Sequence, residues 1–184
     1  MIFDDKMWKT SKSKMNMESR LKKYDFYSQG LIVYYSLWLI GLTIYDMDKG
    51  DIDMSIPTLI LSIVILVLSV YIYAMNFGIR AVNTKQAYVQ IQRILSRTGR
   101  YKDTKNLEEE YYQILDYSEN HNNCDFLQVL YEVRNEEDND KLNGKFTYNK
   151  YLKFVICKIV FYFSIIILLL LPIVGIFYET ISDF

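Results

Sequence analysis

Three apolar stretches, each about as long as a bilayer is thick, divide this chain. They cover residues 27–45, 56–77 and 155–178. A helix needs about 20 mostly apolar residues to cross about 30 Å of hydrocarbon, and neither Ile56–Phe77 nor Ile159–Tyr178 contains a charged side chain. A soluble protein would rarely bury a helix of that length and hydrophobicity. The sequence therefore predicts an all-α membrane protein with three transmembrane helices.

The first stretch is less hydrophobic than the other two, because polar residues such as Ser28, Gln29 and Thr43 dilute it. Its aromatic side chains are typical of a helix that crosses the membrane interfaces. A cleaved signal peptide is the alternative for an early apolar stretch. We prefer a transmembrane helix because 26 residues precede the stretch and no small-residue cleavage pattern follows it.

The lysine and arginine residues indicate the orientation of these helices. Of the 21, seven precede residue 27, one lies between the first two stretches, thirteen lie between 78 and 158, and none follows 178. Loops rich in Lys and Arg stay in the cytoplasm. We therefore expect a multi-pass protein with a cytoplasmic N-terminus, a short outer hairpin, a cytoplasmic middle region and the C-terminus outside.

The length of the chain suits one integrated domain over 1–184. Within it we expect a basic cytoplasmic helix over 1–26, a transmembrane hairpin over 27–77, a cytoplasmic helical region over 78–154 and the third span over 155–178. Apolar residues recur at helical spacing after the second span, which predicts one long helix from Pro57 to about Arg97. A cytoplasmic helical hairpin follows, with one helix from about Thr104 and a short helix capped by Asp125.

No constellation of catalytic or metal-binding residues stands out. The single histidine, His121, makes no ligand pattern with Cys124 and Cys157, which form no CxxC pair. Both cysteines fall on the predicted cytoplasmic side, where a structural disulfide is disfavoured. The acidic run Glu108–Glu110 is typical of a helix start. The sequence thus predicts a protein that is not an enzyme and that uses no cofactor or metal.

The second span carries a polar stripe, which consists of Thr58, Ser62, Ser69, Tyr73 and Asn76. Intervals of four, seven, four and three residues place these side chains on one helix face. Two interpretations stay open. The polar groups can pack and hydrogen-bond against other helices, or in an oligomer they can line a water-filled path.

Two other surfaces are suggested by the pattern. A face of the first span that could admit close helix contact consists of Gly30, Tyr34, Leu37, Gly41 and Tyr45. The third span is apolar all round except for Tyr162 and Ser164, which suits a lipid-facing position. Basic residues that follow the second span, such as Arg80 and Arg93, are explained by topology and by anionic headgroups. Acidic residues follow them closely, so we expect no direct binding of nucleic acid.

Three segments outside the lipid resemble a known family. They are Arg20-Leu21-Lys22-Lys23, Lys85-Gln86-Ala87-Tyr88, and Tyr112-Gln113-Ile114-Leu115 with Ser118-Glu119-Asn120-His121 and Asp125. Together with the hairpin and the long cytoplasmic helix, they resemble the SLATT domains. These are bacterial membrane effector domains associated with SMODS nucleotidyltransferases and SLOG nucleotide-sensing domains. The resemblance covers roughly 8–178, and extends to the subfamily that has a third, C-terminal span and is linked to reverse transcriptases.

The resemblance implies an antiviral effector in the bacterial inner membrane. Its members are expected to form homo-oligomers and to open a pore or breach the lipid bilayer when a cytoplasmic sensor is triggered, which causes abortive infection. A reverse transcriptase or a nucleotide-signalling protein is the implied partner. The alternative is a non-conducting membrane anchor that recruits a soluble defence enzyme.

The segment of Glu119, Asn120 and His121, with Asp125, has two interpretations. It can be a helix stop whose side chains cap neighbouring backbone, or a contact point for the partner or an activating ligand. We expect that Glu119, His121 and Asp125 could bond one another across the turn, which suits either interpretation.

Overall fold

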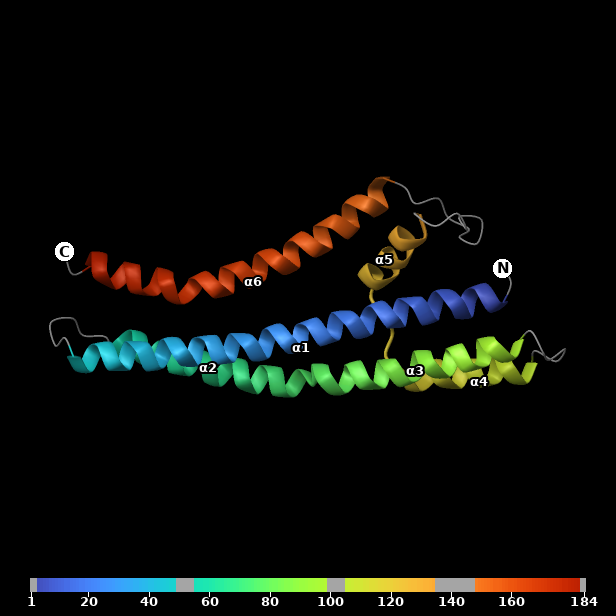
Figure 1. Cartoon of the computed structure of the whole chain (residues 1–184), viewed down its shortest axis with the longest axis horizontal. Coiled ribbons are helices and arrows are strands. Elements are labelled where there is room, and N and C mark those ends of the chain that lie inside the picture. The colour runs from blue at the N-terminus through green and yellow to red at the C-terminus, as the bar shows by residue number, and fades with distance from the viewer. Residues whose placement is uncertain (1–2, 49–54, 99–104, 135–147, 183–184) are drawn as a thin grey trace. The chain divides into compact units, whose positions relative to one another are not determined.

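The computed structural model describes residues 3–48, 55–98, 105–134 and 148–182. Within these ranges it has six helices and no strand (Figure 1). They are α1 (Phe3–Asp48), α2 (Ser55–Met75), α3 (Phe77–Thr98), α4 (Lys105–Tyr117), α5 (Asn123–Arg134) and α6 (Tyr148–Ser182). Three helical segments are long and apolar enough to cross a membrane: Phe3–Met47, Ser55–Thr98 and Tyr148–Val174. The predicted all-α membrane fold is confirmed.

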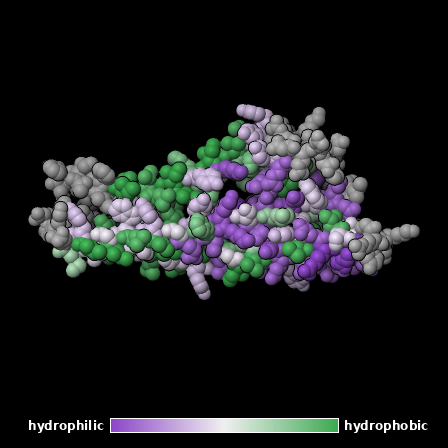
Figure 2. Space-filling model, in the orientation of Figure 1, coloured by the Kyte–Doolittle hydropathy of each residue, from purple (hydrophilic) through white to green (hydrophobic). Residues whose placement is uncertain are grey.

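The chain forms two compact units, each built from segments far apart in the sequence. The first, called here the charged unit, consists of Met1–Lys23 and Phe77–Ile159. The second, called the apolar unit, consists of Tyr24–Asn76 and Val160–Phe184. Hydrophilic side chains gather over the helices of the charged unit and hydrophobic ones over those of the apolar unit (Figure 2). Both α1 and α6 pass from one unit to the other as unbroken helices.

The long helix that we expected from Pro57 to about Arg97 is interrupted at one residue. Asn76 has a left-handed backbone conformation, with a φ angle of 47°, and separates α2 from α3. Asparagine is one of the few residues besides glycine that visits this conformation routinely. The Asn76 N–H donates to the Ile72 carbonyl oxygen at 3.3 Å. Helical hydrogen bonding therefore continues up to the break.

In the charged unit, the first part of α1 is a central helix and not a solvated basic arm. Met7 packs in a cluster with Ile91 of α3 and Tyr111 of α4. Met17 and Leu21 pack against Ala81 of α3 in a second cluster. Polar side chains on the same segment are buried as well, namely Ser11, Ser13, Lys14 and Glu18. A helix that is polar in sequence is thus enclosed by its neighbours, and its buried polar groups need partners.

In the apolar unit, α1 and α2 contact each other along an apolar seam. Tyr35, Leu42 and Leu61 are its buried members, and Val64, Ile65 and Leu68 of α2 pack against them. Many large hydrophobic side chains outside the seam are exposed on α1, α2 and α6. An apolar surface of this extent is stable only when lipid or another protein surface covers it. The exposed apolar side chains therefore agree with the high hydropathy of these helices, and both indicate that the helices lie in a lipid bilayer.

Two tyrosines of α1 hydrogen-bond to the backbone of α6. Pro172 lies inside α6 and has no N–H, so the Leu168 carbonyl, four residues earlier, loses its helical partner. The Tyr35 hydroxyl donates to that carbonyl oxygen at 2.6 Å, and the Tyr34 hydroxyl donates to the Leu169 carbonyl oxygen at 2.9 Å. An unsatisfied carbonyl in lipid costs several kcal/mol. The tyrosines therefore compensate for the proline.

The expected contact face of the first span is open at its two glycines, as far as the described residues show. A Cβ atom added to Gly30 or Gly41 would meet no other atom within 4 Å, and Leu37 is 64% exposed. Tyr34, which belongs to the same face, contacts α6 through its hydrogen bond to the Leu169 carbonyl oxygen. Within the described residues, the face therefore meets another helix at Tyr34 but not at the two glycines.

Candidate functional site

The polar stripe of α2 lies beside the seam and not within it. Thr58, Ser62 and Ser69 are half-buried, whereas Tyr73 is 81% exposed and Asn76 is also exposed. The apolar side chains of the seam make the contact of α2 with α1. Within one chain, much of the stripe is therefore open to lipid, water or a second copy.

The hydroxyl groups of the stripe are bonded locally. Ser62 donates to the Leu59 carbonyl oxygen at 2.7 Å, and Ser69 donates to the Ile65 carbonyl oxygen at 2.7 Å. The Thr58 Oγ1 atom is buried and has no hydrogen-bond partner in the part of the chain that the structure describes. A serine bonded to its own helix can face lipid or water without leaving its donor unsatisfied. Packing and path lining both remain open for this stripe.

The second candidate site is the connection between α4 and α5, here called the junction (Ser118–Asp125). Lys14 of α1 approaches its first residues: its Nζ atom donates to Ser118 Oγ at 2.8 Å and to the Glu119 carbonyl oxygen at 2.9 Å. The Lys14 residue is 1% exposed. A buried ammonium group is costly unless its donors are used. The junction therefore supplies the polar partners that this buried cation requires.

Glu119 of the junction pairs with Arg80 of α3. The Arg80 Nε atom donates to Glu119 Oε2 at 2.9 Å, and the Arg80 Nη2 atom donates to Oε1. This hydrogen bonding to Arg80 lowers the pKa of Glu119 below its usual value. Both side chains are partly exposed, so the pair contributes at most about 1 kcal/mol. Its importance is geometric, because it fixes the junction to the start of α3.

Asp125 forms the more buried ion pair of the junction. Its carboxylate accepts from Arg20 Nε at 2.9 Å and from Arg20 Nη2 at 3.0 Å, and the two side chains are 3% and 20% exposed. Asp125 also accepts from the Asn122 N–H at 2.9 Å. We expected Asp125 to precede the helix as its cap, but α5 begins at Asn123. Asp125 is the third helical residue and reaches back to the flanking residue, as in a capping box.

Among the titratable side chains of the junction, that of His121 has an ordinary pKa close to neutral pH. It is half-buried, and its ring centroid lies 6.4 Å from that of Phe126. Burial, followed by the positive charge of Lys14, lowers the pKa of His121 below 6.5, and Asp125 opposes the shift. The imidazole is therefore neutral near pH 7. Asn120, the other residue that the sequence singled out, is exposed.

The structure brings Glu119, His121 and Asp125 into one junction but gives them different partners. The Glu119 side chain pairs with Arg80 of α3, and the Asp125 side chain accepts from Arg20 of α1 and from the Asn122 N–H. The hydrogen bonds between Glu119, His121 and Asp125 that we considered do not occur among these contacts. From the sequence we explained Lys14 and Arg20 by topology, and Arg80 by topology and lipid headgroups, and we predicted none of their partners in the junction. The available signal was the resemblance, since Arg20 opens one of its segments and Asp125 closes another.

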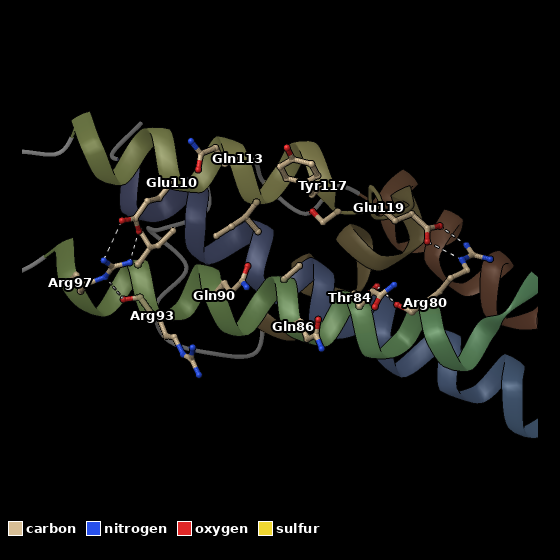
Figure 3. A pocket seen from close by; sticks show the side chains of 15 residues that line it. Arg80, Thr84, Gln86, Gln90, Arg93, Arg97, Glu110, Gln113, Tyr117 and Glu119 are labelled. Carbon is tan, nitrogen blue, oxygen red and sulfur yellow. Dashed lines mark hydrogen bonds and ion pairs between the residues drawn. The ribbon is translucent and has the colours of Figure 1, made fainter.

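A polar groove of about 790 Å³ between α3 and α4 ends at the junction (Figure 3). The Arg80–Glu119 pair lies at one end, and an ion pair between Arg97 and Glu110, with a distance of 2.5 Å, lies toward the other. Side-chain amides such as that of Gln90 lie between them. The groove thus offers hydrogen-bond donors and acceptors to a polar partner.

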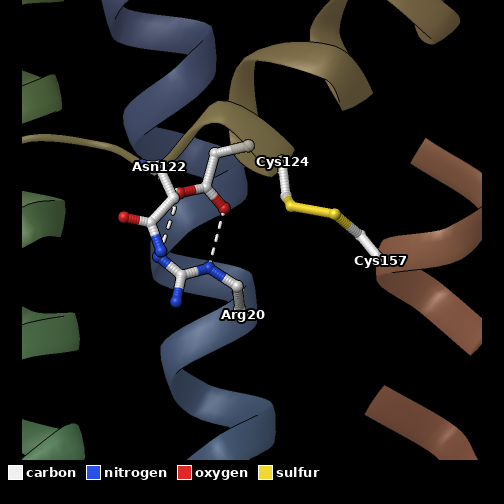
Figure 4. Close-up of a disulfide and its surroundings, with 5 residues drawn as sticks. Arg20, Asn122, Cys124 and Cys157 are labelled. Carbon is white, nitrogen blue, oxygen red and sulfur yellow. Dashed lines mark hydrogen bonds and ion pairs between the residues drawn. A yellow bond between two sulfur atoms is a disulfide. The ribbon is translucent and has the colours of Figure 1, made fainter. Parts of the chain in front are cut away.

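The two cysteines form a disulfide in the charged unit (Figure 4). Our expectation against a structural disulfide is therefore wrong for the structure as it stands. Cys124 is the second residue of α5, and Cys157 lies in α6. The two helices also share an apolar cluster, in which Phe154 of α6 is buried with Leu127 and Leu130 of α5. The packing of α5 against α6 brings the two sulfur atoms together. Our expectation rested on the reducing cytoplasm and did not take this proximity into account.

No group of three or more His, Cys, Asp or Glu side chains that could hold a metal occurs in the ranges that the structure describes. The contacts described for the two candidate sites are hydrogen bonds and ion pairs.

These features define a class: a helical membrane protein whose apolar spans continue into a charged helical unit. The family model for the SMODS and SLOG-associating 2TM effector domain family 5 matches residues 2–178. The chain belongs to this SLATT family, and is a membrane effector domain of the kind associated with SMODS and SLOG conflict systems. No curated protein and no solved structure matches it. The family description counts two transmembrane helices, whereas three candidate spans occur among the described residues.

Proposed function

We propose that this chain permeabilises the bacterial inner membrane as the effector of an antiphage defence system. It forms a homo-oligomer, with the charged unit in the cytoplasm, and opens a path when a cytoplasmic sensor acts on that unit. One observation carries the proposal: each span is covalently continuous with a helix of the charged unit. The helices α1 and α6 cross the boundary unbroken, and α2 is joined to α3 through Asn76.

The junction supplies the point at which the sensor acts. Lys14, Asn16 and Arg20 lie on α1, and Arg80 lies on α3, so these partners of the junction belong to helices that are continuous with spans. A partner that binds Glu119 or Asp125 in place of its arginine removes an ion pair that holds the junction to α3 or to α1. The groove between α3 and α4 ends at the same residues and gives such a partner a polar surface to bind.

The polar stripe of α2 supplies the path in this proposal. Ser62 and Ser69 are half-buried and have their hydroxyl donors satisfied by their own helix. Their oxygen atoms can still accept hydrogen bonds from water. In an oligomer, a ring of such groups lowers the cost of water inside the bilayer, because polar groups in membranes face cavities or protein.

The third span is the basis for proposing the partner. The reverse-transcriptase-linked SLATT subfamily that this chain resembles has a third, C-terminal span, and α6 is long and apolar enough to be one. We assign the sensor to a reverse transcriptase or a nucleotide-signalling protein encoded nearby. Loss of the membrane barrier in an infected cell then stops phage propagation by abortive infection.

To test whether the polar stripe lines the path, two of its serines are substituted in the complete defence system. Ser62→Leu and Ser69→Leu should insert into the membrane but abolish phage-triggered growth arrest. Ser164→Leu is the matched control, because Ser164 lies on α6 and also donates to its own helix, at 2.8 Å to the Phe161 carbonyl oxygen. Growth arrest that survives both stripe substitutions refutes the assignment of the path to α2.

A membrane anchor that recruits a soluble defence enzyme is the alternative function. The groove of about 790 Å³ favours it, since this polar surface lies entirely on the charged unit and needs no change in the spans to bind a partner. The anchor predicts that Arg97→Glu in the groove abolishes defence while the stripe substitutions leave it intact. The permeabilising effector predicts loss of defence from the stripe substitutions.

A further inference from the structure

We propose that Cys124 and Cys157 form a redox-sensitive modification site that locks the charged unit when it is oxidised. This inference rests on the proposed function in one respect, the cytoplasmic position of the charged unit. A reducing cytoplasm keeps such a pair as two thiols in the unstressed cell. The disulfide in the structure is then the form produced by oxidative stress.

The surroundings of the pair suit a reversible reaction. Both cysteines are half-buried, so a small oxidant reaches them while larger molecules are hindered. Their helices are already held together without the bond, because Tyr131 of α5 stacks on Phe154 of α6 with ring centroids 5.1 Å apart. The sulfur atoms therefore remain neighbours in the dithiol form, and forming the bond requires no large rearrangement of α5 and α6.

The reaction needs a two-electron oxidant, which we assign to hydrogen peroxide. Cys124 lies in the first turn of α5, where the helix dipole favours a negative charge, so its thiolate attacks the O–O bond and a hydroxide ion leaves. The Cys157 thiolate then attacks the Cys124 sulfenic acid, the S–S bond forms, and a second hydroxide leaves. Each hydroxide takes up one thiol proton. Overall, two thiols and one peroxide give one disulfide and two waters.

The consequence follows from what each helix is attached to. The first turn of α5 is fixed to α1 by the Arg20–Asp125 pair, and α6 continues into the third span. The disulfide adds a covalent bond between α5 and α6 to contacts that are otherwise noncovalent. Oxidation therefore holds the start of α6 in the arrangement described, so that activation that moves α6 away from α5 is blocked.

The experiment measures thiols and membrane potential in the same cells, which express the full chain with its neighbouring genes. A maleimide–polyethylene glycol reagent should shift the untreated chain by two additions and the peroxide-treated chain by none. Cys124→Ser should show one addition under both conditions, whereas Cys157→Ser should show one addition before peroxide and fewer after it, because peroxide converts the remaining Cys124 thiol to a sulfenic acid. Peroxide before triggering should reduce depolarisation of the wild type by about fivefold or more, the low end of ordinary coupling between sites, and should leave both serine variants unaffected.

Three results would overturn the inference. Two reactive thiols after peroxide would show that the bond does not form, and none before peroxide would show a permanent disulfide. A normal thiol switch with equal depolarisation in wild type and serine variants after peroxide would exclude the lock. A normal thiol switch without depolarisation under any condition would instead refute the proposed permeabilising function and leave the modification site supported.

Discussion

Removal of the Asp125 carboxylate tests whether the junction fastens α5 to α1. The Asp125→Asn substitution keeps the size of the side chain but removes the charge that accepts two hydrogen bonds from Arg20. Exposures of 3% and 20% for Asp125 and Arg20 place this pair between a surface ion pair, worth at most about 1 kcal/mol, and a fully buried one, whose disruption costs about 3–5 kcal/mol. We expect a loss of about 2–3 kcal/mol in the local stability of α5.

Hydrogen–deuterium exchange of the full chain in lipid nanodiscs measures this loss directly. At 1.36 kcal/mol for each factor of ten, the amides of α5 should exchange about 30- to 150-fold faster in Asp125→Asn. Asp116→Asn is the matched control, since Asp116 is exposed on α4, and should change the stability by less than about 0.5 kcal/mol.

A double-mutant cycle with Arg20→Gln identifies the partner. Because Arg20 and Asp125 share one interaction, the double variant should lose about 1–2 kcal/mol less than the sum of the single variants. Additive losses would show that the two residues act independently. Equal exchange of α5 in Asp125→Asn and Asp116→Asn would refute the role of the ion pair altogether.

Three further predictions concern single contacts. Tyr35→Phe should destabilise the detergent-solubilised protein by about 1–2 kcal/mol. The loss should be small in a Pro172→Ala background, because residue 172 then has an N–H that can donate to the Leu168 carbonyl oxygen. Equal losses of stability on thermal unfolding in both backgrounds would contradict the role of Tyr35 in satisfying that carbonyl. The pKa of His121 is lowered in the folded state, so the unfolded chain binds more protons than the folded chain just below pH 6.5. The stability that neutral His121 contributes is therefore complete above that pH and is lost as the pH falls through its folded pKa. Unfolding temperatures measured between about pH 7.5 and 5 should depend less on pH in His121→Gln than in the wild type, and an equal pH dependence would contradict this. At Asn76, where the backbone is left-handed, Asn76→Ala should be about 1 kcal/mol less stable than Asn76→Gly in the same unfolding assay; equal stability of the two variants would argue against the break.

The helices and spans could be predicted because hydrophobicity and helical spacing are local properties of the sequence. The predicted helix start near Thr104 lies one residue from the start of α4 at Lys105. The break at Asn76 was missed because one left-handed residue leaves the apolar pattern around it intact. Its polar side chain was explained by the stripe instead.

The partners of the junction could not be predicted because they depend on how distant helices pack. Arg20 and Asp125 are 105 residues apart in sequence, and nothing local shows which of many basic residues meets which acid. The pairing of Tyr35 with the carbonyl freed by Pro172 likewise requires the register of α1 against α6. For the cysteines, the compartment argument concerned their oxidation state and gave no information on whether their sulfur atoms are neighbours.

Membrane potential tests the central claim, that this SLATT domain permeabilises the inner membrane. A voltage-sensitive dye should be followed in bacteria that carry the chain with its neighbouring genes, before and after phage infection, with Ser62→Leu and Ser164→Leu strains in parallel. Permeabilisation predicts rapid depolarisation after infection in the wild type and in Ser164→Leu, and a stable potential in Ser62→Leu. A stable potential in the wild type, while the system still stops the phage, would contradict the claim and favour the membrane anchor.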